Sequence, residues 1–161
     1  MNASAWSLRE DDARRIAQVL SGFLREAGAR TALLVDRNGQ MLATAGETPE
    51  FDHIAFASLT AADFSANDQL ARMLGETDFG ALFHQGERES LYLADVARRV
   101  ILVILFDNST TLGLVKLRVR RVVTELSNLF EELFARVGPA PRVEAGFLGE
   151  AEDEIDRLFG A

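Results

Sequence analysis

The chain has 161 residues, of which 48% are hydrophobic and 26% charged, and it carries no cysteine and a net charge of −8. These values fit one globular domain with a tail, and they exclude disulfides and any cysteine-based metal site or nucleophile. An acidic chain lacks the basic footprint of nonspecific nucleic-acid binding, so we expect no nucleic-acid partner. The longest apolar run, residues 100–106, is too short to cross a bilayer, and no signal peptide is visible. We therefore expect a cytoplasmic protein with no membrane insertion.

The first half of the chain predicts a helix, a hairpin and a second helix. Apolar residues recur at helical spacing over residues 8–27, and Gly28 is a natural end to that helix. Residues 31–36 and 41–45 are typical of strands, and the Asn38-Gly39 pair between them is a strong hairpin signal. Residues 51–74 then predict a long helix that ends at Gly75.

The helix over 51–74 is apolar on two sides. One arc holds Phe56, Leu59, Ala62, Ala66, Leu70, Met73 and Leu74, and the other holds Ile54, Ala57, Ala61, Phe64 and Ala71. A helix that is apolar on two sides is buried on two sides, so a sheet can cover one arc and a second subunit the other. Between the arcs lies a mixed strip of Ser58, Ser65, Asp68, Gln69 and Arg72.

The second half predicts three strands and a last helix. Residues 79–84, 90–95 and 99–107 are strand-like and closely spaced, which indicates an antiparallel meander. Residues 115–120 alternate and would fit a strand, but the length of the element and the 3–4 stepping of its apolar residues favour a helix over 111–137. The order α-β-β-α-β-β-β-α predicts an α+β fold, a five-stranded antiparallel sheet with helices packed on it.

We expect a domain over residues 1–137, a flexible linker over 138–149 and an amphipathic C-terminal peptide over 150–161. Ile155, Leu158 and Phe159 would share one face of a short tail helix in an acidic background. Such a helix is too short to be stable alone, so it needs a groove in its own fold or in a partner.

No catalytic constellation is visible. The chain contains no phosphate-binding loop motif, no dinucleotide motif and no nucleophile elbow. His53 and His84 have no second ligand at metal spacing on their elements, so we expect no metal, no cofactor and no enzyme activity of its own. Lys116, Arg118, Arg120 and Arg121 form a basic group. It is either the solvent-exposed face of the last helix or a contact for an acidic partner or for the acidic tail of the dimer mate.

Four stretches carry a family resemblance: residues 34–40 (LVDRNGQ), 57–61 (ASLTA), 83–86 (FHQG) and 106–115 (FDNSTTLGLV). With the element order, they resemble the roadblock/light-chain-seven domain family and, within it, the MglB-like GTPase-activating proteins that act on Ras-like MglA GTPases. Residues 154–159 (EIDRLF) are similar to the C-terminus of those proteins.

The resemblance implies a homodimer built from the helix over 51–74 and the strand over 79–84. The interface residues would be Ile54, Ala57, Phe64, Ala71, Phe79, Leu82 and His84. It also implies that two copies engage one small Ras-like GTPase of the MglA type. The GTPase contacts would be Ser58, Ala61, Ala62, Ser65, Asp68, Gln69 and Arg72.

The resemblance further implies stimulation of GTP hydrolysis without an arginine finger, by remodelling the switch regions so that the GTPase's own catalytic groups reach the γ-phosphate. The tail would bind the GTPase away from the main interface, and the process would be cell polarity or motility, with the protein concentrated at a cell pole. The alternative is a roadblock dimer that binds a small GTPase as a scaffold without activating it. One departure stands out: Phe64, Asp68 and Gln69 replace residues that are usually small in this family, so a GTPase packed there would need a matching surface.

Overall fold

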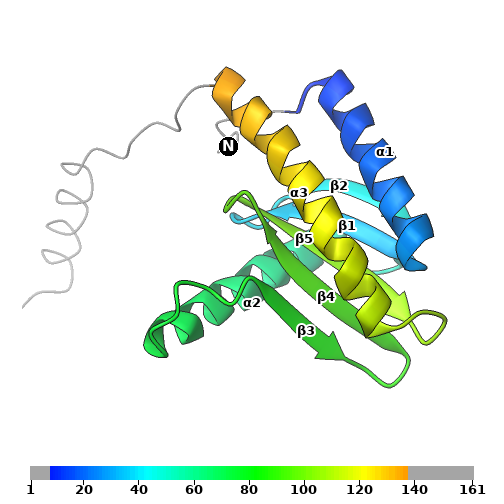
Figure 1. Cartoon of the computed structure of the whole chain (residues 1–161), viewed down its shortest axis with the longest axis vertical. Helices are drawn as coiled ribbons and strands as arrows, with labels where there is room; N and C mark the ends of the chain where they lie inside the picture. The colour runs from blue at the N-terminus through cyan, green and yellow to red at the C-terminus, as the bar shows by residue number, and fades with distance from the viewer. Residues whose placement is uncertain (1–7, 138–161) are drawn as a thin grey trace, which may run out of the picture.

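Three helices and five strands follow one another in the order that the sequence predicts, in a computed structural model that describes residues 8–137 (Figure 1). The elements are α1 (Glu10–Ala27), β1 (Thr31–Asp36), β2 (Met41–Gly46), α2 (His53–Met73), β3 (Ala81–Gln85), β4 (Glu89–Val96), β5 (Val100–Asp107) and α3 (Leu112–Val137). The stretch 115–120 is helical, so the apolar stepping, and not the local alternation, predicted its structure correctly. The third strand begins two residues later than expected, after Gly80 with φ +69°.

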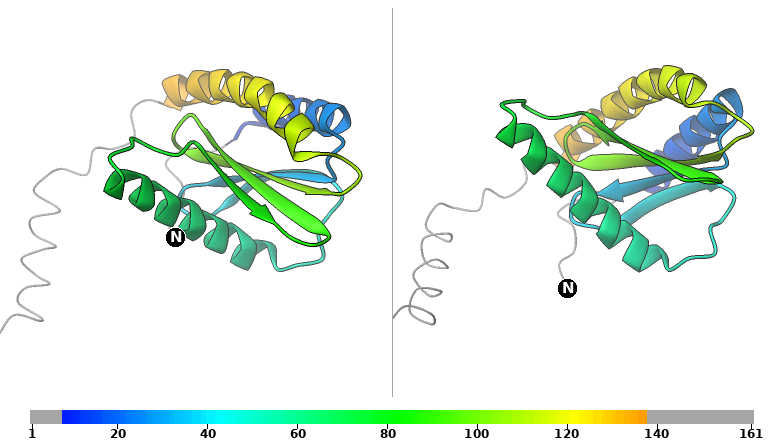
Figure 2. Two further views of the ribbon diagram at one scale, coloured as in Figure 1. Left: turned by 60° about the horizontal axis from the view of Figure 1, so that its bottom comes forward. Right: turned by 90° about the horizontal axis from the view of Figure 1, so that it is seen from below.

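The strands form one antiparallel sheet in the order β2-β1-β5-β4-β3. The hairpin β1–β2 and the meander β3–β4–β5 meet where β1 pairs with β5, with Leu33 opposite Val103. Helices α1 and α3 cover one face of this sheet, and α2 lies alone on the other (Figure 2). The result is a three-layer arrangement in which β3 and β2 are the two edge strands.

Alternate residues of the central strands feed two separate apolar clusters. On the side of α1 and α3, the larger cluster includes Leu34, Leu102 and Ile104 together with Leu20 and Leu126. On the α2 side, the smaller cluster holds Leu33, Val35, Leu93, Ile101, Val103, Ala57 and Phe64. Because both faces of β1 and β5 are covered, these strands are apolar almost throughout, as the unbroken run in residues 100–106 predicts.

Helices α1 and α3 are joined near one end by an ion pair between a buried aspartate and a partly exposed arginine. Asp12 on the first turn of α1 is buried, and its Oδ1 accepts a hydrogen bond of 2.8 Å from Arg136 near the end of α3. This hydrogen bond outweighs the opposing effect of burial and holds the pKa of Asp12 below its ordinary value. The two helices therefore run antiparallel, with the start of one beside the end of the other.

The turn between β1 and β2 approaches α2 closely. Oδ1 of Asp36 accepts hydrogen bonds from the backbone N–H groups of Asn38 (2.9 Å) and Gln40 (3.0 Å), which fixes the turn. Gly39 has φ +91°, and a Cβ there would lie 3.2 Å from the Cα of Ser58 on α2. Glycine at this position therefore serves both the turn geometry and the contact with the helix.

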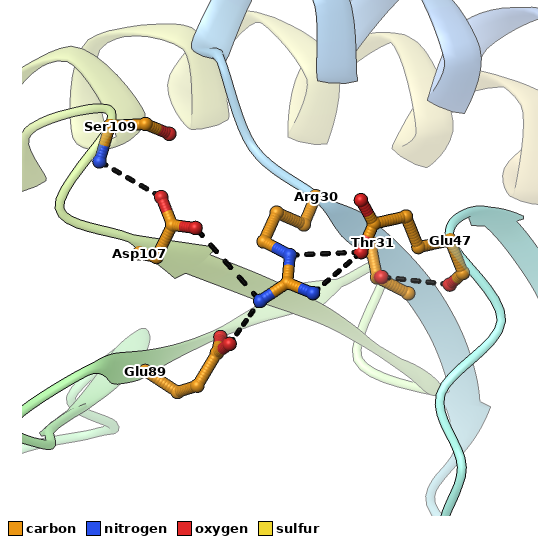
Figure 3. A network of polar contacts seen from close by, with 6 residues as sticks. All are labelled: Arg30, Thr31, Glu47, Glu89, Asp107 and Ser109. Atoms are coloured by element: carbon orange, nitrogen blue, oxygen red, sulfur yellow. Dashed lines mark hydrogen bonds and ion pairs between the residues drawn. The ribbon is translucent and has the colours of Figure 1, made fainter.

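A second polar network fixes the loop that leads into α2 (Figure 3). The Arg30 guanidinium donates to Glu47 (2.7 Å), also pairs with Glu89, and lies 3.9 Å from Asp107. The hydrogen bond and charge of Glu47 contribute most to raising the pKa of Arg30. Asp107 accepts a hydrogen bond from the backbone N–H of Ser109, and hydrogen bonding by Ser109 is the main reason why the pKa of Asp107 is lowered. The network thus connects the segment before α2 to the start of β4 and the end of β5.

Candidate functional site

Helix α2 has one face packed on the sheet and the opposite face open. The carboxylate of Asp52 caps its first turn by accepting hydrogen bonds from the N–H groups of Ile54 (3.0 Å) and Ala55 (3.2 Å). The buried residues step by three and four along the sheet-facing side: Ala57, Thr60, Phe64, Asn67 and Ala71. Most of these side chains are small, and Phe64 is the one large apolar side chain among them.

The open side of α2 carries a continuous run of apolar residues, which we call the apolar stripe: Ala55, Leu59, Ala62, Ala66, Leu70 and Met73. The three large members are mostly exposed, at 70% for Leu59, 57% for Leu70 and 82% for Met73. A stripe of large exposed apolar side chains on one helix marks an interaction surface.

The stripe corrects the assignment of the two arcs. Four residues of α2 were expected in the dimer interface. Ala57, Phe64 and Ala71 are at most 1% exposed and face their own sheet, whereas Ile54 is 82% exposed. The arc with Leu59 and Leu70 is the one that remains open. Apolar periodicity finds two arcs but does not say which faces the sheet. Here Ala57, Phe64 and Ala71 of one arc pack inward, and Phe56 of the other arc lies half-buried against the same cluster.

The expected GTPase contacts fall mainly on a second surface beside the stripe. Residues at steps of four and three form one row along the helix: Ile54, Ser58, Ala61, Ser65, Asp68 and Arg72. Gln69 adjoins this row. We call the set the polar row, because most of its members after Ile54 are polar or charged. Ser58, Ala62, Ser65, Gln69 and Arg72 are exposed, and Ala61 is half-buried. Asp68 differs from its neighbours, because its side chain is only 13% exposed.

Asp68 is held by Arg37, a residue that the sequence patterns did not single out. The guanidinium of Arg37 lies 2.5 Å from Oδ2 of Asp68, pairs with Asp95 on β4, and sits 4.9 Å above the ring of Phe64. Burial alone would lower the pKa of Arg37, but the hydrogen bonds of Asp95 and Asp68 more than offset it and raise the pKa. The Asn38-Gly39 turn signal marks this position, and only the folded structure shows that the arginine beside it joins the turn, α2 and β4.

The expected interface residues on and before β3 surround an open sheet edge. β3 pairs with β4 alone, so its other side has no strand beside it among residues 8–137. Phe79 is exposed, Leu82 packs half-buried against the α2-side cluster, and His84 lies with its Nε2 2.6 Å from Oδ2 of Asp63 on α2. This last contact ties the edge strand to the helix that carries the stripe.

Within residues 8–137 there is no group of three His, Cys, Asp or Glu residues placed to hold a metal ion. Over the same part of the chain, no helix has the length and apolar character needed to cross a membrane. The expected tail residues Ile155, Leu158 and Phe159 lie outside the described residues.

Comparison with known proteins identifies this architecture. The profile of the Roadblock/LC7 domain matches residues 15–106. The solved structure of Myxococcus xanthus MglB shares 43% identity with a TM-score of 0.71 and covers 74% of this chain and 97% of its own. The gliding protein MglB of Thermus thermophilus shares 38% identity, with a TM-score of 0.73 and coverage of 79% and 96%.

A third solved structure, described as MglB with tetrameric arrangement, shares 37% identity with a TM-score of 0.75 and covers 80% of this chain and 97% of its own. A search of curated proteins gave no match. The profile match and the similarity to MglB structures over most of the chain are consistent with the observed order of elements. The chain therefore belongs to the Roadblock/LC7 domain family and, within it, to the MglB-like proteins.

Proposed function

We propose that the protein is a homodimeric regulator of a small Ras-like GTPase of the MglA type, which it stimulates without contributing a catalytic side chain. The observation that carries the proposal is the apolar stripe on α2, open beside the free edge of β3 on an MglB-like scaffold. The stripe supports self-association, and the polar row beside it supports binding of a second protein.

The dimer would bury the stripe against the stripe of a second copy. Leu59, Leu70 and Met73 supply its large side chains, while Ala62 and Ala66 allow two helices to approach closely. The free edge of β3 could pair with the β3 edge of the partner at the same time and extend the sheet across the two-fold axis. Phe79, Leu82 and His84 then remain in the proposed interface. The buried residues Ala57, Phe64 and Ala71 leave it, and Ile54 lies outside the stripe, at the start of the polar row.

The GTPase would bind the polar row of the dimer. A two-fold axis beside α2 places two copies of the row on one side of the assembly, which supports the stoichiometry of two protomers for one GTPase. Ser58, Ser65, Gln69 and Arg72 are available for this contact, whereas Ala62 belongs to the stripe that the dimer would bury. Asp68 would not contact the GTPase directly. Its side chain pairs with Arg37 and so helps to hold the binding surface in place.

The structure also reduces the problem posed by the three bulky residues. Phe64 points into the core and Asp68 is folded back onto Arg37, so neither projects from the outer surface of α2. Gln69 is the one of the three that is exposed. A GTPase surface would therefore need to accommodate one enlarged side chain, and this supports binding at this face.

Activation would come from positioning. Arg118, Arg120 and Arg121 lie on α3, on the other face of the sheet from α2, and Arg37 is engaged by two carboxylates. A dimer that holds the switch regions so that the GTPase's own arginine and glutamine reach the γ-phosphate acts through orientation and electrostatics. We propose a role of this kind in cell polarity or motility, with the protein concentrated at a cell pole.

The second candidate function is a scaffold dimer that binds the GTPase without activating it. The observation that favours it is the bulky, exposed side chain of Gln69 beside the polar row. Single-turnover GTP hydrolysis by an MglA-type GTPase from the same cell, with and without the protein, separates the two. Faster hydrolysis supports the proposal, binding with an unchanged rate supports the scaffold, and the absence of binding contradicts both. The full chain and a chain ending at residue 137 are compared, to separate the domain from residues 138–161.

A further inference from the structure

A surface on the far side of the sheet from α2 is basic and partly apolar in an otherwise acidic protein. We define the basic face of α3 as Lys116, Leu117, Arg120 and Arg121, all exposed. Arg121 pairs with Glu125 at 3.3 Å, but within residues 8–137 neither Lys116 nor Arg120 has an ion-pair partner. Leu117 is 61% exposed. All other large exposed apolar residues of the described part lie between Phe51 and Phe79, on α2 or in the segments next to it.

A groove between α1 and α3 adjoins this face. It has a volume of about 320 Å³, and its lining combines apolar residues, two arginines and two carboxylates: Gln18, Val19, Gly22, Phe23, Glu26, Arg118, Arg121, Val122 and Glu125. A Cβ added at Gly22 would meet no atom within 4 Å, so the groove is open at that point. The guanidinium of Arg118 lies 3.9 Å from Glu26 through one terminal nitrogen, while its Nε is buried without a hydrogen-bond partner in the described residues. The groove thus offers an apolar wall from Val19, Phe23 and Val122 and one unused donor, beside carboxylates that already pair with its two arginines.

We propose that residues 150–161 of the same chain dock on the basic face of α3 and in the adjoining groove. This segment carries five acidic residues and one arginine, so its charge is opposite to that of the basic face. If it is helical, Ile155, Leu158 and Phe159 share one side, which would contact Leu117 and the groove while the carboxylates meet Lys116, Arg120 and Arg121.

The length of the connecting chain permits this contact. From Val137 back to Leu117 the helix α3 spans 20 residues, or about 30 Å at 1.5 Å per residue. The 12 residues from 138 to 149 can span up to about 40 Å when extended. Because a tether of this kind gives an effective concentration in the millimolar range, a contact that is weak between separate molecules suffices to hold the segment.

The inference goes beyond the proposed function and does not depend on it, since no GTPase is needed for the contact. Its consequence is that the tail is held on the face of the sheet opposite the apolar stripe. Any partner that takes the tail must displace it from α3. The strength of the contact should fall as salt is raised, because exposed charges are screened.

The absence of cysteine from the chain allows a clean test with one nitroxide label. Ala161→Cys carries the label in the full-length protein, and paramagnetic broadening of backbone amide signals is measured by NMR. We expect signals of residues 113–124 and of Gly22 to be broadened. The charge-reversed variant Lys116→Glu/Arg120→Glu should lose the broadening, whereas Arg88→Glu/Arg98→Glu, an equal change of charge at residues elsewhere, should keep it.

A mixed sample identifies which chain provides the tail. Isotope-labelled protein without nitroxide is combined with unlabelled protein that carries it, and we expect no broadening on α3. In this sample the nitroxide and the isotope are on different chains. Broadening of α3 signals would therefore show that a second copy supplies the tail, and it would overturn the proposal. Broadening at α2 in place of α3, no broadening at all, or broadening that survives the Lys116→Glu/Arg120→Glu change would overturn it as well.

Discussion

Arg37 on the β1–β2 turn and Asp68 on α2 form an ion pair of 2.5 Å, with both side chains largely shielded from water. The two residues are 31 positions apart in the chain, and the same guanidinium also pairs with Asp95 on β4. It holds the exposed face of α2 in a fixed position relative to the sheet. That position determines which helix residues a partner can reach, and the first prediction follows from it.

Replacing Arg37 by Met should lower the free energy of unfolding by about 2 kcal/mol, because two partly buried carboxylates would lose their shared partner. Thermal or urea denaturation measures the change. Arg72→Met on the exposed polar row is the matched control and should stay within about 0.5 kcal/mol of the native protein. Equal stability of the two variants would show that the ion pair does not hold α2.

Asp12 should make stability depend on pH. Its pKa is lower in the folded protein than in the unfolded chain, so its carboxylate stabilises the fold above the ordinary aspartate pKa of about 3.9 and this contribution is lost as pH falls through the folded value. Asp12→Asn should therefore be clearly less stable than the native protein at pH 7, and the difference should shrink below about pH 4. Urea denaturation across this range measures it, with the exposed neighbour Asp11→Asn as control. A difference that stays constant with pH would contradict the ion-pair account.

The protein should be a dimer at micromolar concentration, and Leu59→Arg or Leu70→Arg should weaken that dimer at least about 100-fold. A guanidinium forced into an apolar interface costs several kcal/mol, and each 1.4 kcal/mol is about tenfold in affinity. Light scattering against concentration follows the mass. Leu117→Arg, an equally apolar exposed position on the other side of the sheet, should leave the dimer intact. A native mass near 17.7 kDa throughout would reject self-association.

Ser65→Arg and Gln69→Arg should abolish GTPase binding while the dimer persists. Both residues are exposed on or beside the polar row, and a long charged side chain there would clash with a docked partner or be left desolvated. Titration with the GTPase by calorimetry gives affinity, and light scattering confirms the dimer. Binding that survives both changes would place the GTPase elsewhere on the molecule.

No arginine of this protein should act as a catalytic finger. Arg72 is the exposed arginine on α2, and Arg118, Arg120 and Arg121 lie across the sheet. Removal of a true finger lowers the hydrolysis rate by roughly 10³–10⁵. Single-turnover assays of the four Arg→Ala variants, at GTPase concentrations that saturate each of them, should show far smaller effects. A loss of that size in any one variant with binding retained would mean that the chemistry is provided in trans.

The sequence was sufficient to predict the order of the elements and most of their limits. Strong apolar periodicity marked α1 and α3, the Asn38-Gly39 turn marked the first hairpin, and the unbroken run at residues 100–106 marked a strand covered on both faces. These features are local, and a local pattern is enough to specify them.

The orientation of α2 could not be predicted in the same way. Its two arcs are both apolar. Which arc faces the sheet depends on how the helix packs on strands that precede and follow it in the chain. Arg37 was missed for a related reason, because its partners Asp68 and Asp95 are distant in sequence and come together only when α2 docks. The candidate site therefore depended on tertiary contacts that no single segment encodes.

The pairing of β1 with β5 has a consequence for how the chain folds. Leu33 pairs with Val103 although many residues separate them in the chain, whereas β1–β2 and β4–β5 are connected by short turns. Closing a long loop costs chain entropy before the contacts that reward it can form, so this central register should set the rate of folding, and the two hairpins should form first. Until that step is complete, α2 has no finished sheet to cover. Its buried and exposed arcs are then both open to solvent, and a newly made chain is at its most prone to aggregate.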